Sequence, residues 1–412
     1  MRLNITYVCH YFVPEPAAPA ARVHEFARAW VQAGHSVDVL TTFPNHPLGR
    51  IPARYRARAW TTESLDGIRV LRCWLYAVPN RGVGRRGLDH LSFMLTSLLF
   101  GLPRIKRTDV VIASSPTLFS ALSAWLIARL ERVPFVLEVR DLWPEAIVDL
   151  RLMRPDSPSV KLLRRLAAFL YARAARVVVV TEAFADRLVQ QGVPRTKLSV
   201  IPNGADTRFF APDASATTQA AARASLGLDG KFVVAYVGSH GLSHGLDVVL
   251  DAAAVQPEVT YLLVGDGADR DRLLAERNRR RLTNVVMRPS VPRNDVRDVY
   301  AAADACLVPL RDVPIFETFV PSKLFEVLAA GRPVIGAVRG EAGEILARSG
   351  GALVVEPQRG DQLAAAVDSL RRDPRLATEL ARRGRAFAKQ HYDRDQLAVR
   401  YLDLLHEVVA RC

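Results

Sequence analysis

Residues 315–335 read IFETFVPSKLFEVLAAGRPVI, and this stretch predicts a helix that is followed at once by a buried strand. Pro321 suits the first position of the helix, where its missing N–H costs nothing. Gly331 is a natural residue to end the helix, and the apolar strand Pro333–Ala337 comes directly after it. Short strands that alternate with helices in this way indicate a parallel sheet with helical crossovers.

The same alternation runs through the rest of the chain. In the first half we expect strands at Leu3–Cys9, Ser36–Thr41, Val110–Ala113, Phe135–Val139 and Val177–Thr181. In the second half we expect them at Phe232–Gly238, Val259–Gly265, Val285–Met287, Ala305–Pro309 and Pro333–Ala337. The pattern predicts an α/β protein with two doubly wound sheets in series, and ligands bind such sheets at the carboxyl ends of the strands.

Length and composition agree with two domains. The chain has 412 residues, half of them hydrophobic, which is enough for two cores at about 100 to 200 residues per domain. The natural boundary lies near 203–231, where Gly204, Pro212 and a run of small residues indicate a linker.

The net charge of +14 is concentrated in the first half of the chain. Residues 1–205 contain 28 Lys and Arg against 15 Asp and Glu, whereas the remainder is almost balanced. Such an asymmetry suggests a polyanionic partner: an anionic membrane, a phosphorylated substrate or nucleic acid. An Arg-rich surface that is simply solvated is the alternative.

The cysteines and the N-terminus favour a cytoplasmic protein. The four cysteines, Cys9, Cys73, Cys306 and Cys412, form no Cys-x-x-Cys pair, so neither a disulfide framework nor a zinc site is expected. The first residues resemble a strand more than a signal peptide. No stretch approaches the roughly 18 to 20 apolar residues that span a bilayer.

The segment Leu88–Leu102 reads LDHLSFMLTSLLFGL and has basic residues on both sides. These are Arg81, Arg85 and Arg86 before it, and Arg104, Lys106 and Arg107 after it. An apolar segment with basic flanks suits a helix that lies on an anionic membrane surface. A buried helix between ordinary basic loops is an equally open interpretation.

Lys323 and Glu326 are the polar residues of the expected helix. A cation in the first turn opposes the helix dipole, which favours anions, so Lys323 makes sense if an anion binds at the same end. Glu326 lies three residues on, on a similar face, where its carboxylate can accept hydrogen bonds from ribose hydroxyls. An exposed Lys–Glu pair at helical spacing is the alternative.

This stretch resembles the signature of glycosyltransferase family 4, whose members are retaining enzymes of the GT-B fold. That fold consists of two Rossmann-like parallel-sheet domains facing a cleft. In the family's Glu-x7-Glu motif the second Glu binds the nucleotide ribose, and here it is Glu326. The first position, near the donor sugar, falls on Thr318 beside Glu317, so the match is weaker there. Ser322 completes the expected nucleotide-binding set on this helix.

The loop after strand 232–238 departs from the family. Gly238 is matched, but Ser239 and His244 stand where the family usually has an Arg and a Lys that stabilise the leaving diphosphate. Lys323 must then carry more of the diphosphate charge, while His244 can donate a hydrogen bond. An ordinary loop histidine is the alternative.

Further site residues follow from the resemblance. Gly265 lies in LLVGDGADRDRL, which matches the family's strand–Gly-x-Gly–helix unit, and Arg288 lies in the segment that reads the base. Arg22 follows the loop after the first strand, a place of phosphate approach. Arg140 and Asp141 stand where the family often has His-Asp near the donor sugar, and with Lys323 they are the expected catalytic residues.

The resemblance implies an acceptor-binding domain at 1–204, with a helix at 395–412 packing back on it, and a nucleotide-sugar domain at 205–394. Residues 40–47 and the sequence DLWPE at 141–145 resemble those of a branch of the family that is associated with N-acetylfucosamine-type transfer in bacterial surface polysaccharide assembly. The expected donor is a UDP-sugar or another NDP-sugar, and the acceptor is a polyprenyl-diphosphate-linked sugar or a glycan at the inner face of the plasma membrane.

No metal cofactor is expected, because nothing resembles the Asp-x-Asp motif of the other major glycosyltransferase fold. Two alternatives remain. A UDP-sugar 2-epimerase of related build would use the same donor without an acceptor. A nucleic-acid-binding protein is suggested by charge alone, but no recognisable binding module supports it.

Overall fold

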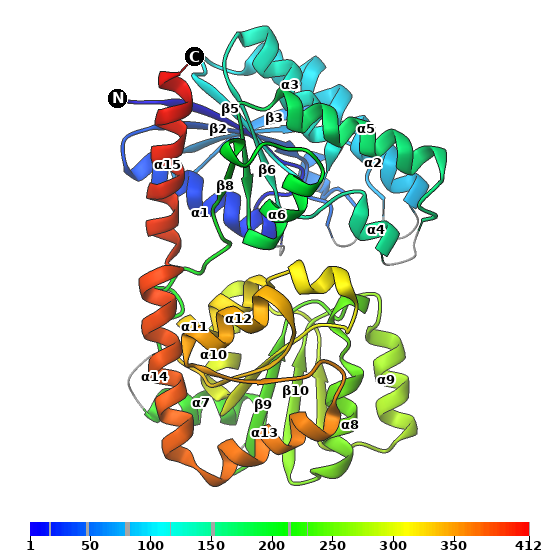
Figure 1. Cartoon of the computed structure of the whole chain (residues 1–412), viewed down its shortest axis with the longest axis vertical. Coiled ribbons are helices and arrows are strands. Elements are labelled where there is room, and N and C mark those ends of the chain that lie inside the picture. Colours follow the sequence, from blue (N-terminus) through cyan, green and yellow to red (C-terminus); the bar gives the residue numbers. More distant parts are fainter. Residues whose placement is uncertain are drawn as a thin grey trace. The chain divides into compact units, whose positions relative to one another are not determined.

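The computed structural model describes residues 1–411 except 16–17, 47–48, 79–82, 116, 150–152, 213–215 and 229. Of the residues discussed above, Pro47, Arg81 and Cys412 therefore lie outside the described residues. The chain divides into two compact units: unit 1 comprises Met1–Pro202 with Asp395–Cys412, and unit 2 comprises Asn203–Arg394. Each unit contains a sheet covered by helices (Figure 1). The prediction of two Rossmann-like α/β units is confirmed.

The sheet of unit 1 has eight strands among the described residues. In sheet order they are β3 (Trp60–Leu65), β4 (Ile68–Cys73), β2 (Ser36–Thr42), β1 (Asn4–Val8), β5 (Val110–Ser114), β6 (Phe135–Val139), β7 (Arg176–Val179) and β8 (Leu198–Val200). Neighbouring strands are parallel except β3, which pairs antiparallel with β4. The central strands are buried on both faces, which is why they read as continuous runs of apolar residues.

The helices of unit 1 cover both faces of this sheet. They are α1 (Ala18–Gln32), α2 (Val83–Thr96), α3 (Leu118–Glu131), α4 (Glu145–Asp149), α5 (Pro158–Arg173), α6 (Glu182–Gln190) and α15 (Arg394–Ala410). α1 and α15 share one core with β1 and β2. There Tyr401 packs edge-on against Trp30, whose Nε1 donates to the carbonyl of Ala398 at 2.9 Å. The last helix of the chain is therefore part of the core of unit 1.

The antiparallel hairpin β3–β4 was not foreseen. Its turn is Asp66-Gly67, both at positive φ, which is the two-residue turn that joins twisted strands without splaying them. The strands β8 and β14 were also missed, because they are only three and four residues long. The predicted strand 177–181 ends too late, since Thr181 is the N-cap of α6 and accepts from the N–H of Phe184.

α2 and the π-helical turn Ser97–Gly101 contain most of the segment Leu88–Leu102, for which the sequence allowed either a helix on a membrane surface or a buried helix. One face packs inside unit 1, where Phe93 is fully buried. The other face carries Leu88, Leu95 and Leu99, whose exposed fractions are 56%, 49% and 67%. Because residues seven and eleven apart in a helix lie on nearly the same side, these leucines form one apolar stripe. The segment is thus neither wholly buried nor wholly exposed.

The sheet of unit 2 is entirely parallel, with six strands among the described residues. In sheet order they are β11 (Val285–Arg288), β10 (Val259–Val264), β9 (Phe232–Val237), β12 (Ala305–Pro309), β13 (Val334–Ala337) and β14 (Ala352–Val355). The first connections run from β9 outward to β11, and the later ones run from β12 outward to β14. The topological switch point therefore lies between β9 and β12, where ligands bind in sheets of this kind.

The helices of unit 2 are α7 (Ala216–Leu226), α8 (Asp247–Val255), α9 (Arg270–Arg279), α10 (Arg293–Ala302), α11 (Ser322–Ala329), α12 (Gly340–Ser349), α13 (Gly360–Arg372) and α14 (Pro374–His391). The presence of α7 corrects the predicted linker at 203–231, because its small residues form a helix instead of a loop. In α11 the position of Pro321 is also corrected: it is the N-cap, and Ser322 is the first helical residue.

None of the helices formed by the described residues combines the length and the apolar character that crossing a bilayer requires. Cys9, Cys73 and Cys306 are buried and free.

Candidate functional site

The carboxyl edge of the unit 2 sheet brings most of the predicted nucleotide-binding residues together. Three segments meet at its switch point: the loop after β9, the loop after β10 and the first turn of α11. The two loops lie in contact, because the N–H of Gly238 donates to the Val264 carbonyl and the N–H of His240 donates to the Asp266 carbonyl, both at 2.9 Å. The loops therefore form one rigid rim beside the helix.

Gly265 makes this contact possible. Its φ is +152°, and a Cβ atom at this position would lie 1.9 Å from the carbonyl oxygen of Gly238. No side chain fits there without moving backbone. The sequence suggested that this glycine allows close approach to a ligand, but the structure shows that the close approach is to the neighbouring loop.

Lys323 is the second residue of α11, and its ammonium group lies against an aromatic face. Its Nζ lies 3.7 Å from the ring centroid of Tyr236 and has no hydrogen-bond partner among the described residues. Gly238 leaves the room for this arrangement, since a Cβ there would lie 2.5 Å from Nζ. Burial lowers the pKa of Lys323 to about 7, against the opposing effect of the Glu326 carboxylate. A solvated lysine would not show such a shift.

Two histidines of the loop after β9 lie around the same ring. The imidazoles of His240 and His244 are each 5.9 Å from the Tyr236 ring, centroid to centroid. Both nitrogens of His240 and Nδ1 of His244 are buried without hydrogen-bond partners among the described residues. Burial lowers the pKa of His240 to about 4 and that of His244 well below its usual value, with Lys323 adding to both shifts. Both are therefore neutral at pH 7, and each has a single ring N–H. That of His240 is free to donate to a ligand, whereas His244 already bonds the Pro309 carbonyl.

His240 was missed by the sequence analysis. It occupies a position where the family pattern carries no chemistry, and the only available signal was its place directly after a buried strand in a Gly-x-x-Gly loop. Together, Lys323, His240 and His244 leave buried polar groups unpaired, which costs about 1–3 kcal/mol per group unless a ligand pairs with them.

The first turn of α11 adds backbone donors to this cluster. The N-cap Pro321 has no side-chain acceptor, so it caps none of the first N–H groups of Ser322 and Lys323. Ser322 itself is half-buried. A helix N-terminus with uncapped N–H groups attracts anions. The cluster is therefore suited to an anion with several oxygens, such as a diphosphate.

Glu326 lies one turn further along α11. Its Oε2 is 3.5 Å from the hydroxyl of Tyr300, the longest distance at which the hydroxyl can donate. Thr318 and Glu317 lie in the short 3-10 helix before α11. The hydroxyl of Thr318 donates to the Ile315 carbonyl at 2.7 Å, whereas the Glu317 side chain is exposed. Neither Thr318 nor Glu317 thus reproduces the first carboxylate of the motif at a buried position.

Arg288 ends β11 and is partly engaged elsewhere. Its Nη2 donates to the carbonyl of Leu226 at the end of α7, at 3.1 Å, while its Nε is buried without a partner among the described residues. Its own carbonyl accepts from the N–H of Gly265 at 3.0 Å. The backbone of Arg288 therefore belongs to the rim of the site, and its side chain ties the rim to α7.

The predicted residues of unit 1 lie at the carboxyl edge of their own sheet. Asp141 follows β6, and burial raises its pKa to about 6 while Arg140 acts in the opposite direction. The Nε of Arg140 is 3.9 Å from Glu138 Oε1, and its Nε and Nη1 have no hydrogen-bond partner in the described part of the chain. Burial lowers the pKa of Arg140.

Arg22 is held entirely by protein groups. It is 1% exposed, and its Nε donates to Glu138 Oε2 at 3.2 Å. Its two terminal nitrogens donate to the carbonyls of Pro202 and Ile201 at 2.6 and 2.9 Å. This geometry argues against the predicted phosphate contact, because the guanidinium is already satisfied and closed to solvent. Its observed role is to fix the chain where it leaves β8.

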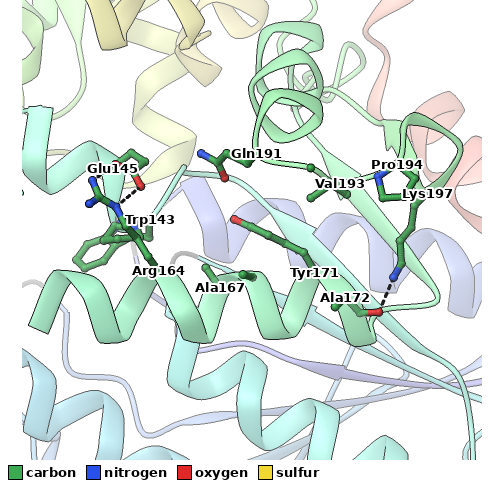
Figure 2. A pocket seen from close by; sticks show the side chains of 13 residues that line it. Trp143, Glu145, Arg164, Ala167, Tyr171, Ala172, Gln191, Val193, Pro194 and Lys197 are labelled. Atoms are coloured by element: carbon green, nitrogen blue, oxygen red, sulfur yellow. Dashed lines mark hydrogen bonds and ion pairs between the residues drawn. The ribbon is translucent and has the colours of Figure 1, made fainter. Parts of the chain in front are cut away.

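A cavity of about 730 Å³ lies elsewhere in unit 1, between α5, the segment 143–145 and the segment 191–197 that follows α6. Figure 2 shows the ion pair of Glu145 with Arg164 at one end, Tyr171 between, and Lys197 at the other end. Both Arg164 bonds to the carboxylate are 2.9 Å long, and Lys197 donates to the Ala172 carbonyl at 2.7 Å. Because these polar groups are already paired, the cavity lacks the unpaired donors that mark the cluster in unit 2.

Comparisons with known proteins agree with this geometry. Residues 18–204 match the family described as "Glycosyl transferase 4-like domain", and residues 218–387 match "Glycosyl transferases group 1". The chain is 28% identical over 351 residues to a putative colanic acid biosynthesis glycosyl transferase, WcaI, of Escherichia coli K12. The aligned region covers 82% of this chain and 85% of the relative.

Solved structures show the same fold. Sucrose-phosphate synthase from Thermosynechococcus elongatus superposes with a TM-score of 0.76 at 20% identity, covering 99% of this chain and all of that one. Anabaena Alr3699/HepE in complex with UDP and glucose superposes with a TM-score of 0.73 at 19% identity, covering 98% of this chain and all of that one. The two family matches together take in most of the sequence. The chain is therefore a glycosyltransferase with a 4-like domain followed by a group 1 domain, and it has the GT-B architecture of two Rossmann-like units.

Proposed function

We propose that this protein is a retaining glycosyltransferase that transfers an N-acetylated sugar from a UDP-sugar to a polyprenyl-diphosphate-linked or glycan acceptor during bacterial surface polysaccharide assembly. The observation that carries the proposal is the cluster of unpaired donors around Tyr236 at the N-terminus of α11. The names of the relatives support the pathway, since WcaI is described as acting in colanic acid biosynthesis and a solved neighbour holds UDP with glucose.

The donor half of the reaction follows from the cluster in unit 2. In this proposal the diphosphate oxygens accept from Lys323, from the neutral imidazole of His240, and from the first N–H groups of α11. Glu326 lies one turn along and holds the ribose hydroxyls. These donors are in place before the reaction, so they stabilise the charge that builds on the diphosphate as the sugar leaves, and this needs no metal ion.

The chemical step retains the configuration at the anomeric carbon. The acceptor oxygen forms a bond to that carbon on the face from which the diphosphate departs. The carbon–oxygen bond to the diphosphate breaks, and the acceptor proton passes to the departing phosphate oxygen. We assign Arg140 and Asp141 of unit 1 to the donor sugar, on the strength of their resemblance to the family's His-Asp pair. Positioning and electrostatics then supply most of the rate.

The acceptor half is assigned to unit 1 at a membrane surface on the inner face of the plasma membrane. Two observations support this. The first is the excess of basic residues in the first half of the chain, and the second is the apolar stripe of Leu88, Leu95 and Leu99. Exposed leucines beside basic residues are the combination that binds anionic lipid surfaces.

The donor site is tested by calorimetric titration of UDP, GDP and ADP with EDTA present. We expect one nucleotide, UDP, to bind clearly tighter than the others. Glu326→Ala should weaken UDP binding by about tenfold or more, because two charge-assisted hydrogen bonds to the ribose are lost. Glu344→Ala, which removes an exposed carboxylate on α12, is the matched control and should leave the affinity unchanged. If none of the three nucleotides binds, the proposed donor site is wrong.

A further inference from the structure

A second cluster of unpaired buried groups lies in unit 1 and contains no residue of the proposed donor site. His10 comes two residues after the end of β1, and Asp89 and His90 are consecutive residues of α2. All three are buried, with exposed fractions of 2%, 6% and 8%. One nitrogen of each imidazole and one carboxylate oxygen all lie within 4.8 Å of one another. Two imidazoles and a carboxylate are thus gathered around one point, away from solvent.

The contact between His10 and Asp89 is close but is not a directed hydrogen bond. Nε2 of His10 lies 3.2 Å from Oδ1 of Asp89, yet that oxygen accepts no hydrogen bond in the part of the chain that the structure describes. The Nδ1 of His10 is also buried without a partner there. Two groups that share a hydrogen bond aim at each other, whereas two ligands of one ion aim their lone pairs at a third point between them. The contact is thus not a hydrogen bond, which leaves Oδ1 of Asp89 buried and unpaired among the described residues.

The spacing suits a tetrahedral ion. With Zn–N and Zn–O distances of about 2.0 to 2.1 Å, two ligand atoms of a tetrahedral site lie about 3.3 Å apart. His10 and Asp89 already have this separation, and the third ligand reaches it with a side-chain movement of roughly 1.5 Å or less. The His10 backbone is held in place, since its carbonyl accepts from the hydroxyls of Thr41 and Thr42 at 3.4 and 2.8 Å. Its ring is packed edge-on against His90 and Phe93.

We propose that His10, Asp89 and His90 form a binding site for one divalent transition-metal ion, zinc above all, with water as the fourth ligand. Two imidazole nitrogens favour zinc over magnesium or calcium, which take oxygen ligands. Three protein ligands leave one coordination position for water or another oxygen ligand, as in zinc sites that are not purely structural. Arg86, one turn before His90, hydrogen-bonds Tyr11.

The site lies at the carboxyl edge of the unit 1 sheet, because His10 follows the central strand β1. This is the edge where ligands bind in doubly wound sheets. The inference is separate from the proposed diphosphate and ribose contacts, whose residues all belong to unit 2. Metal binding at His10 can therefore be tested independently of nucleotide binding at Lys323.

The test uses the full chain, stripped of metal with a chelator and then dialysed. Zinc titrated by calorimetry should bind one ion per chain, and Co²⁺ should give the intense visible absorption of a tetrahedral site. His10→Gln and His90→Gln should each weaken zinc binding by about 100-fold or more, since each removes one of three ligands. His24→Gln is the matched control, because this histidine of α1 lies outside the cluster and pairs with Asp66 at 2.8 Å. Mg²⁺ should not compete.

Either of two results would overturn the proposal: no zinc bound by the wild type, or zinc bound equally by the wild type and the two glutamine variants. Should a glutamine variant fail to fold, Asp89→Asn keeps the shape of the third ligand and removes its charge, and it must weaken zinc binding as well. Zinc should raise the melting temperature of the wild type and of His24→Gln, but not that of Asp89→Asn. UDP binding by each folded variant should match the wild type, which separates this result from that of the donor site.

Discussion

Two cationic side chains at the carboxyl edges of the two sheets, Arg22 in unit 1 and Lys323 in unit 2, are paired in opposite ways. At the edge of unit 1, Arg22 is buried and fully bonded to Glu138 and to two carbonyls. At the edge of unit 2, Lys323 is buried against an aromatic ring with no bonded partner among the described residues. The first arrangement stabilises the fold, and the second is complete only when an anion is bound.

The difference shows that two sheets of similar topology can use a buried cation for different purposes. A buried charge is tolerated when it is paired, so the Arg22 network can close the end of β8 permanently. An unpaired buried lysine costs stability, and proteins keep such residues at functional sites.

The largest expected effect is on unit 1. Arg22→Met should lower the free energy of unfolding by about 3–5 kcal/mol, because it leaves Glu138 buried without its guanidinium and frees two carbonyls. Urea denaturation followed by circular dichroism measures this. Arg56→Met, at an exposed position, is the control and should change stability by less than about 0.5 kcal/mol. A loss for Arg22→Met as small as the control would show that the Arg22 network is not what stabilises this edge.

The same kind of substitution in unit 2 should act in the opposite direction. The pKa of Lys323 is lowered in the folded state, to about 7, so the unfolded chain binds more protons between pH 7 and the unperturbed value near 10.4. Burying the charged lysine therefore destabilises the folded state below pH 7, and this destabilisation decreases as the pH rises. Lys323→Met should raise stability by about 1–2 kcal/mol near pH 6, with the gain vanishing toward pH 10. Destabilisation at pH 6 would contradict the unpaired state of Lys323.

The smallest expected effect concerns the surface of unit 1. Replacing Leu88, Leu95 and Leu99 together by Ser should reduce binding to anionic vesicles by about tenfold, because the apolar stripe no longer enters the interface. The matched control replaces three other exposed apolar residues of unit 1 by Ser: Leu130, Leu162 and Val399. Vesicle sedimentation measures both. Equal binding by the two triple variants would assign the attraction to charge alone.

The main strands were predictable because buried parallel strands are short continuous apolar runs between helices. The hairpin β3–β4 had a signal, Asp66-Gly67, but β3 alternates exposed residues such as Thr62 with partly buried ones such as Glu63, so it did not resemble a buried strand. The helix α7 was hidden by the small residues of 216–226, which read as a linker. The apparent preference of these small residues for a loop was thus overridden by the tertiary context.

The site was only partly predictable for a different reason. Lys323 and Glu326 stand close in sequence at helical spacing, so their pattern was visible. The placement of Lys323 over Tyr236, with His240 beside them, depends on contacts between segments that are more than 80 residues apart in the sequence. The grouping of His10 with Asp89 is of the same kind. No periodicity or spacing reveals such contacts, because they arise from the sheet topology.

The central claim is that the N-terminus of α11 holds a diphosphate through Lys323. The most direct test is calorimetric titration of UDP into the wild type and Lys323→Met at about pH 8, in two buffers of different ionisation enthalpy. Binding to the wild type should take up roughly one proton, as the lysine gains its charge against the diphosphate, and the affinity of Lys323→Met should be about 100-fold lower or weaker still. Equal affinities, with no proton taken up by the wild type, would contradict the account.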